Sequence, residues 1–297
     1  MKKYTVYGSC QAHGLATMLN TNPHFTLQYQ YYQVKPTWGL TLEEITHYNN
    51  EIFPQMDLFI YQPVANYDLP MTTKYITENV LKKDCVVIVF PFLYFNAYHP
   101  YTCYIHNPST DTGLGFHLKD WLYHDRNLIN AYCQPNFDLQ TLLNHINNPD
   151  FYVRDYLVNQ LETSLYELRR QENAQYYGHQ IKIADFISNQ YQIKLLFWTV
   201  NHPTKYVFQY LAFEICNVLN IWTHYDENLD PLLHFGITPL YHSVAKHLNL
   251  QFDYPKLYEQ NNQKWFKKQA FILAIQRYNE FCQTPAHKNV LMSISLR

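Results

Sequence analysis

The chain has 297 residues, of which 47% are hydrophobic, and this length allows one large domain or two smaller ones. Its formal net charge is −2, and it shows short basic pairs such as Lys82-Lys83 in place of a basic stripe, so nucleic acid is not an expected partner. No run of about 20 apolar residues predicts a membrane span, and the N-terminus lacks the apolar stretch of about 7–15 residues that an export signal needs. We therefore expect a cytoplasmic protein.

The first half of the chain alternates between strand-like and helix-like segments. One continuous apolar run, Cys85–Phe90, is typical of a strand that is covered on both faces in a parallel sheet. Thr41 and Glu44 form the capping-box pattern of a helix start. In chain order, we expect a strand at Lys3–Tyr7, a helix at Gln11–Leu19, a strand at Phe25–Tyr31, a helix from Thr41 to about Tyr48, and strands at Leu58–Gln62 and Cys85–Phe90.

The second half is mainly helical by its periodicity. We expect helices at Leu118–Tyr132, Leu139–Ile146 and Val153–Tyr177, a last strand at Ile193–Thr199, a helix at Pro203–Leu219, a helix opened by Thr238-Pro239, and a helix at Gln263–Phe281. Alternating strands and helices predict an α/β fold, a three-layer sandwich with a mainly parallel sheet and extra helices in the middle and at the C-terminus. We assign residues 1–220 to the catalytic domain and 221–297 to a helical extension packed on it.

Six cysteines are spread thinly through the chain, and none forms a Cys-x-x-Cys pair. We expect them to be reduced and mostly buried, as in a reducing compartment. Metal is not expected either, because the histidines show neither a His-Glu-x-x-His nor a His-x-His spacing. With seven glycines and no glycine-rich motif, a phosphate-binding loop is also absent from the sequence.

Two short polar turns follow the first and the last predicted strands. They are Gly8-Ser9-Cys10-Gln11 and Asn201-His202-Pro203-Thr204. Ligands of open α/β sheets bind outside the carboxyl ends of the strands, so we expect both turns at the same edge of the sheet. The sequence therefore predicts the functional site at these two turns.

Cys10 is the candidate nucleophile of the first turn. At a helix N-terminus, unpaired N–H groups and the partial positive charge favour a thiolate, and the same amides can bind an oxyanion. Gly8 allows a tight turn, while Ser9 and Gln11 add polar groups, with Gln11 a further possible donor. The alternative is that Cys10 is only a small core residue after a strand.

Histidines supply the candidate general base. His202 follows a strand and precedes a helix, where its ring can take a proton from a nucleophile and return it to a leaving group. His99 is similarly placed after the Cys85–Phe90 strand. His124 lies on a predicted helix, which favours a packing or substrate-orienting role.

Several stretches of the chain together resemble the WcbI family of polysaccharide-biosynthesis enzymes. The string Tyr7-Gly8-Ser9-Cys10-Gln11-Ala12 is similar to the Gly-Asn-Cys-Gln signature of that family. Further matches extend to about residue 215: the Asp57–Pro63 strand, the Tyr94–Pro100 stretch, Tyr123-His124 and Asn201-His202-Pro203. The resemblance implies an SGNH-hydrolase-like α/β fold, coenzyme A binding and acetyl transfer to capsular polysaccharide or its precursors.

The sequence departs from the family pattern at two places. Ser9 stands where the family usually has Asn, which removes one possible oxyanion donor. Thr199 stands where SGNH hydrolases carry the Asp of an Asp-x-x-His-Pro motif, so the sequence favours a Cys10–His202 dyad over a triad. If an acid orients His202, Asp125 is a candidate.

Three functions are compatible with these residues. The first is an acyl-CoA-dependent O-acetyltransferase acting on a glycan or sugar-nucleotide acceptor, with acetyl-CoA as co-substrate and with a possible peripheral membrane contact. In that reading Cys10 and His202 are catalytic, Gly8, Ser9, Gln11 and Asn201 shape the oxyanion and substrate site, Tyr98, His99 and His124 line the acceptor pocket, and Lys35, Arg126 and Lys205 are candidates for the phosphates. The second is an esterase or deacetylase with water as acceptor. The third is a non-catalytic glycan- or nucleotide-binding protein, which predicts an unreactive, buried Cys10 far from His202.

Overall fold

The computed structural model describes residues 1–65, 67–104, 123–235, 237–252, 272–280, 282–283 and 285–295. Their contacts divide the chain into two compact units. Unit 1 consists of Met1–Tyr94 and Thr163–Gly236, and unit 2 consists of Phe95–Glu162 and Ile237–Arg297. The assignment of 1–220 to a catalytic domain and 221–297 to an extension remains a prediction.

Unit 1 is built on a five-stranded parallel sheet with the strand order β2-β1-β3-β4-β7. Tyr4 is aligned with Leu58 in the first of its central pairs, and Leu58 is aligned with Val86 in the next. The central strands are buried almost throughout, as expected of a parallel sheet that helices cover on both faces. The strands are β1 Lys2–Tyr7, β2 Tyr29–Tyr31, β3 Leu58–Tyr61, β4 Val86–Val89 and β7 His179–Gln180.

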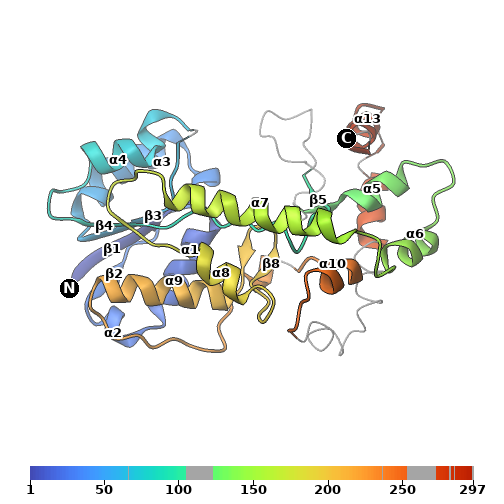
Figure 1. Cartoon of the computed structure of the whole chain (residues 1–297). Helices are drawn as coiled ribbons and strands as arrows, with labels where there is room; N and C mark the ends of the chain where they lie inside the picture. The colour runs from blue at the N-terminus through green and yellow to red at the C-terminus, as the bar shows by residue number, and fades with distance from the viewer. Residues whose placement is uncertain are drawn as a thin grey trace. The chain divides into compact units, whose positions relative to one another are not determined.

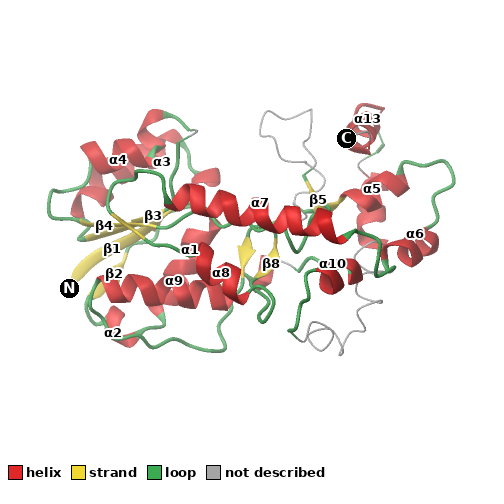
Figure 2. Ribbon diagram, in the orientation of Figure 1, coloured by secondary structure: helices red, strands yellow, loops and turns green. Residues whose placement is uncertain are grey.

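Helices lie on both faces of this sheet, as Figures 1 and 2 show. On one face, α3 and α4 pack over an aromatic and aliphatic cluster that includes Ile45, Phe53, Phe59 and Ile76. On the other face, α1 packs against α9, and Gly14 permits the approach because a Cβ there would lie 2.6 Å from Phe208 Cζ. The helices of unit 1 are α1 Cys10–Asn20, α2 Pro23–Thr26, α3 Leu42–His47, α4 Thr73–Asn79, α8 Ala184–Gln190 and α9 Lys205–Val218, with the short turns η1 Thr37–Gly39, η2 Tyr48–Ile52, η3 Phe53–Gln55, η4 Leu69–Met71 and η6 Leu233–Phe235.

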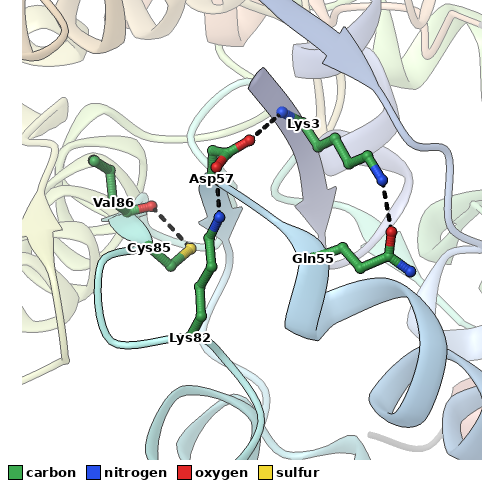
Figure 3. A network of polar contacts seen from close by, with 6 residues as sticks. All are labelled: Lys3, Gln55, Asp57, Lys82, Cys85 and Val86. Atoms are coloured by element: carbon green, nitrogen blue, oxygen red, sulfur yellow. Dashed lines mark hydrogen bonds and ion pairs between the residues drawn. The ribbon is translucent and has the colours of Figure 1, made fainter. Parts of the chain in front are cut away.

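Polar groups join the amino ends of the central strands (Figure 3). The Asp57 carboxylate accepts a hydrogen bond from Lys3 N at 2.6 Å and pairs with Lys82 Nζ at 2.5 Å. The hydrogen bond from Lys82 is the main reason that the pKa of Asp57 is lowered. Lys3 Nζ in turn donates to Gln55 Oε1. This network lies at the amino ends of the strands, opposite the carboxyl end where the Gly8-Ser9-Cys10-Gln11 turn follows β1.

Unit 2 is mainly helical. Its strands are β5 Thr102–Cys103 and β6 His124–Asp125, which pair antiparallel. Asp125 begins the following helix, because its Oδ1 accepts from Asn127 N at 2.8 Å and Leu128 N at 3.2 Å. The helices are α5 Arg126–Tyr132, α6 Leu139–Ile146, α10 His242–His247, α13 Pro285–Ser295 and a helical segment at 272–280, while α7 Arg154–Glu172 contributes residues to both units.

The predicted α/β fold, with three layers and a mainly parallel sheet, is confirmed. The capping box of Thr41 and Glu44 is present with both hydrogen bonds. α6 has the predicted bounds, and Asp138 caps it. None of the six cysteines, all of them in the described part of the chain, forms a disulfide bond, although only Cys103 and Cys216 are fully buried. No helix in the described residues has the length and apolarity that a membrane crossing requires.

The predicted last strand is wrong in its place in the fold. Only its end, β8 Phe197–Thr199, is extended, and it pairs antiparallel with β9 His202–Pro203 in a separate hairpin. The fifth strand of the sheet is instead β7, which its two polar residues concealed. The glycine just before it, Gly178, was the only local sign in the sequence of a close backbone approach at β7. Gly178 has φ +102°, and a Cβ there would lie 2.5 Å from Val87 O.

Other differences arise at helix starts. The predicted strand Phe25–Tyr31 begins as helix α2, because Asn22 caps that helix and Pro23 favours its first turn. The predicted helices Leu118–Tyr132, Val153–Tyr177 and Pro203–Leu219 form in shorter versions, as α5, α7 and α9, with 118–122 outside the described residues. The helix expected after Thr238-Pro239 begins only at His242, and residues 263–271 and 281 of the last predicted helix also lie outside the described residues.

Candidate functional site

The first turn connects β1 directly to α1. Ser9 is the N-cap of α1, and its Oγ accepts a hydrogen bond from Gln11 N at 3.3 Å. Gly8 has φ +158°, and a Cβ at this position would lie 2.8 Å from Gln62 Oε1. Glycine is therefore required by the close approach of Gln62, and Cys10 becomes the first residue of the helix.

Cys10 is a half-buried residue of unit 1. Its pKa is raised, because burial outweighs the opposing effects of the Ser9 hydroxyl and of the N–H groups of Gln11 and Cys10. The helix terminus was expected to favour the thiolate, and its N–H groups do act in that direction, but burial is the larger effect on this pKa. A raised thiol pKa means that a nearby base helps the sulfur to attack.

The N–H groups of this turn differ in their hydrogen bonding. Ser9 N donates to Gln62 Oε1 at 3.1 Å, Gln11 N donates to Ser9 Oγ, and Ala12 N donates to Ser9 O at 3.0 Å. The Cys10 N–H lies next to the sulfur of its own side chain, whose pKa it lowers. The N–H beside the thiol is consequently the candidate donor of this turn to an oxyanion.

Gln11 is fully buried, and its side-chain amide is saturated with hydrogen bonds. Its Nε2 donates to Leu93 O at 2.6 Å and to Asn201 O at 2.7 Å. Its Oε1 accepts from Gln62 Nε2 at 2.6 Å and from Leu93 N at 3.0 Å. With both N–H groups engaged, Gln11 acts as a link between the turns, so its predicted use as an oxyanion donor does not fit this geometry.

His202 lies in the β8–β9 hairpin, immediately after Asn201. The hairpin is tightened by a hydrogen bond from His202 N to Thr199 Oγ1 at 3.2 Å. Burial, and secondarily the nearby His234, lower the pKa of His202 to about 4. The imidazole is therefore neutral at physiological pH, which is the form that accepts a proton. The bond from Gln11 to Asn201 O links this hairpin to the Cys10 turn, although β8 is not a strand of the sheet from which the pairing of the two turns was predicted.

Thr199, which stands where SGNH hydrolases have an Asp, binds the backbone of the hairpin and not the His202 ring. Thr199 Oγ1 receives the His202 N–H and donates to Asn201 Oδ1 at 3.3 Å, so it shapes the hairpin. Asp125, the other candidate, belongs to unit 2, where it caps α5 and accepts from Tyr241 OH at 2.5 Å. Its carboxylate thus has structural partners within its own unit.

The three residues expected to line an acceptor pocket belong to unit 2 and are buried there. Tyr98 packs edge-on against Phe95, His99 Nδ1 lies 3.2 Å from Tyr101 OH, and His124 Nδ1 lies 3.2 Å from Tyr278 OH. All are at most 3% exposed. These contacts fit packing roles, and their part in acceptor binding remains a prediction.

The candidate phosphate-binding cations have different surroundings. Lys35 is paired with Glu44 at the start of α3. Lys205 lies at the start of α9, three residues after His202, and its Nζ is 5.5 Å from the centre of the Tyr206 ring. Arg126 is the first residue of α5 in unit 2. Lys205 is therefore the candidate that the fold places beside the His202 hairpin.

Gln62 was not singled out from the sequence, although it contacts both Ser9 and Gln11. It follows the buried strand β3 at the carboxyl edge of the sheet and precedes Pro63. A polar residue directly after an apolar strand, at the edge where ligands bind, was the signal that pointed to it.

Comparisons with known proteins bear on the whole chain. Residues 3–224 match the family described as "Polysaccharide biosynthesis enzyme WcbI". A solved structure described as "Structural insights into WcbI, a novel polysaccharide biosynthesis enzyme" has a TM-score of 0.67 and 24% sequence identity, covering 100% of this chain and 99% of the other. That structure is further described as the native protein without a disulfide bond between coenzyme A and one of its cysteines. No curated protein is similar enough to match.

Proposed function

Because the chain belongs to the WcbI family of polysaccharide biosynthesis enzymes, we propose that it transfers an acetyl group from acetyl-coenzyme A to a hydroxyl group of a capsular or surface polysaccharide, or of a sugar-nucleotide precursor. The observation that carries the proposal is the half-buried Cys10 in a turn that is hydrogen-bonded to the hairpin of a neutral histidine. The mention of coenzyme A and a cysteine in the description of the similar structure supports the choice of donor.

The proposed reaction has two steps, and each needs a base. In the first, the Cys10 sulfur attacks the acetyl carbonyl carbon, an S–C bond forms, and the bond to the coenzyme A sulfur breaks. His202 takes the thiol proton and returns it to the departing thiolate. In the second, His202 takes the proton of the acceptor hydroxyl, whose oxygen attacks the carbonyl carbon of the Cys10 thioester. The O–C bond forms, the S–C bond breaks, and His202 returns the proton to the Cys10 sulfur. The oxyanion of both steps is stabilised by Cys10 N–H.

The other two functions make different demands on the same residues. A non-catalytic protein predicts a buried Cys10 far from His202, and the partial exposure of Cys10 and the hydrogen bond between Gln11 and Asn201 argue against it. An esterase or deacetylase uses the same residues with water in place of the sugar hydroxyl. Transfer and hydrolysis therefore have to be separated by experiment.

Acetylation of Cys10 is the first test. The protein is incubated with acetyl-coenzyme A, and intact-mass and peptide mass spectrometry locate any added acetyl group, while calorimetry measures binding. Cys10→Ala is expected to bind coenzyme A without forming the adduct. Cys85→Ala is the matched control, because Cys85 is another half-buried cysteine of unit 1, with its pKa raised to about 12 by burial. It is expected to form the adduct normally.

Each outcome separates the functions. An adduct on Cys10 that is stable in water and discharged by a polysaccharide or sugar-nucleotide acceptor supports transfer. An adduct that water discharges at once supports the hydrolase. Binding without an adduct supports direct transfer with His202 as the base, and absence of binding refutes the transferase. The peripheral membrane contact also remains a prediction, testable by vesicle sedimentation.

A further inference from the structure

Gln62 is a fully buried amide at the carboxyl end of β3, the middle strand of the sheet. Its Oε1 accepts hydrogen bonds from Ser9 N at 3.1 Å and from Ser9 Oγ at 2.8 Å. Its Nε2 donates to Gln11 Oε1 at 2.6 Å and to Pro91 O at 3.4 Å. One side chain thus joins the ends of β1, β3 and β4 beside the Cys10 turn.

The direction of these hydrogen bonds is fixed by backbone groups at both ends. Gln62 faces Ser9 N, which only donates, and a carbonyl that only accepts. Gln11 faces Leu93 N, which only donates, and Asn201 O, which only accepts. Neither amide can be turned over without losing hydrogen bonds. A continuous chain therefore runs from Ser9 Oγ through the two amides to the carbonyl of Asn201.

We propose that Gln62 is a positioning residue for acyl transfer. By binding Ser9 on one side of Cys10 and Gln11 on the other, it fixes the position of the Cys10 thiol relative to the Cys10 N–H. This inference rests on the proposed function but goes beyond it, because Gln62 is inaccessible and acts only through its neighbours. By engaging the N–H and hydroxyl of Ser9, Gln62 also leaves Cys10 N as the oxyanion donor of the turn.

The expected effect is on acylation and not on the thiol itself. Misplacing one oxyanion donor lowers acyl-transfer rates by about 100- to 1,000-fold, and small displacements of reacting groups cost on the order of 100-fold. Alkylation of the same thiol by iodoacetamide needs no oxyanion donor. Both rates are proportional to the fraction of Cys10 present as thiolate, so this fraction drops out of their ratio at each pH. The ratio therefore reports how well the oxyanion donor is placed relative to the thiol.

Gln62→Glu is the informative variant, because it keeps the shape and the acceptor oxygen for Ser9 but replaces the amide donor. The carboxylate form cannot donate to Gln11 Oε1, whereas the protonated acid offers one O–H. Burial raises the pKa of such a carboxyl group, so lowering the pH toward 6 restores the donor. Positioning through this hydrogen bond thus predicts a pH dependence that the wild type lacks.

Acylation is measured with 4-nitrophenyl acetate, which makes the test independent of acetyl-coenzyme A. The Cys10 thiolate attacks the ester carbonyl carbon, the S–C bond forms, the C–O bond breaks, and 4-nitrophenolate leaves with the electron pair. The rate is taken as the difference from Cys10→Ala. Alkylation is followed on the Cys10 peptide by mass spectrometry. Failure of the proposed function would appear only with acetyl-coenzyme A.

A matched control lies beyond the opposite end of α1. Asn22 is also a fully buried amide, and its Nδ2 donates to Trp222 O at 3.0 Å. Asn22→Asp removes a buried donor and introduces a buried carboxyl, as Gln62→Glu does, but about 16 Å of helix separates it from the Cys10 turn. It controls for general destabilisation.

We expect Gln62→Glu to lower the ratio of acylation to alkylation about 10- to 100-fold at pH 8, with recovery toward pH 6, and Asn22→Asp to leave the ratio unchanged. A ratio equal to the wild type at every pH, or an equal loss in Asn22→Asp, overturns the proposal. If Gln62→Glu fails to fold, Ser9→Ala removes the stronger of the two bonds to Gln62 Oε1, the one from Ser9 Oγ at 2.8 Å, and leaves the bond from Ser9 N. An unchanged ratio in that variant also overturns it.

Discussion

The neutral state of His202 makes the stability of the protein depend on pH in a calculable way. Burial lowers the pKa of this histidine to about 4, whereas an unfolded histidine has a pKa of about 6.5. Between these values the unfolded chain binds a proton that the folded chain excludes. The stabilisation is therefore fully present above about pH 6.5 and is lost as the pH falls through 4.

The size of the effect follows from the same two values. A difference of about 2.5 pKa units corresponds to about 3 kcal/mol once both states are protonated. Integrated between pH 7 and pH 5, the loss is about 2 kcal/mol. His202→Asn removes the titrating group, so its free energy of unfolding is expected to fall by about 2 kcal/mol less over this interval than that of the wild type.

Urea denaturation at pH 7, 6 and 5, followed by circular dichroism, measures these free energies. His13→Asn is the control, because His13 is exposed on α1 and its loss is expected to leave the pH dependence unchanged. The titration of the His202 ring protons by NMR gives the pKa directly. A midpoint near 6.5, or equal losses of stability in the wild type and His202→Asn, would show that the histidine is not held neutral by burial.

Three further substitutions test contacts that hold unit 1 together: two close approaches at glycines and one ion pair. Gly8→Ala places a Cβ 2.8 Å from Gln62 Oε1 and is expected to cost about 1–3 kcal/mol of unfolding free energy, measured by urea denaturation, and to slow 4-nitrophenyl acetate cleavage. Gly14→Ala places a Cβ 2.6 Å from Phe208 Cζ and is expected to cost about 1–2 kcal/mol net of its gain in helix propensity; Phe208→Leu in the same chain should recover part of this, and strict additivity would contradict the clash. Asp57→Asn is expected to lower the free energy of unfolding by about 1 kcal/mol at pH 7. Because the pKa of Asp57 is lower in the folded chain, its carboxylate stabilises the fold above the unfolded pKa of about 4, and this contribution is lost as the pH falls through the folded pKa. A difference between variant and wild type that stays constant across pH in urea denaturation would refute the ion pair.

Local sequence signals predicted the elements that local chemistry decides. The strand-like segment before Gly8, the capping box at Thr41 and the helical periodicity of Leu139–Ile146 act within a few residues, and the structure has strand, box and helix in those places. The two-residue strand β7 has no apolar run that would predict it from the sequence. Its pairing with β4 follows a close backbone approach at Gly178, where a Cβ would lie 2.5 Å from Val87 O.

The features of the site that were not predicted from the sequence depend on contacts between residues far apart in the chain. The bond between Gln62 and Gln11 joins residues 51 positions apart, and the bond from Gln11 to Asn201 joins residues 190 positions apart, so no periodicity reports them. The charge state of Cys10 is a balance between burial and nearby donors, and only the folded structure gives the degree of burial. The two turns were predicted to lie together on the expectation that both follow strands of one sheet, whereas β8 belongs to a separate hairpin and the hydrogen bond from Gln11 to Asn201 O makes the connection.

The use of amides to tie the two turns together has a consequence for enzyme kinetics. Side-chain amides do not ionise near neutral pH, so the link from Gln62 through Gln11 to Asn201 keeps the same hydrogen bonds while Cys10 and His202 gain or lose protons. Such a link also passes no proton between them, because each amide hydrogen stays on its own nitrogen. Inflections in a pH–rate profile of this protein would therefore report the reacting groups and the substrate, with the scaffold contributing none of its own.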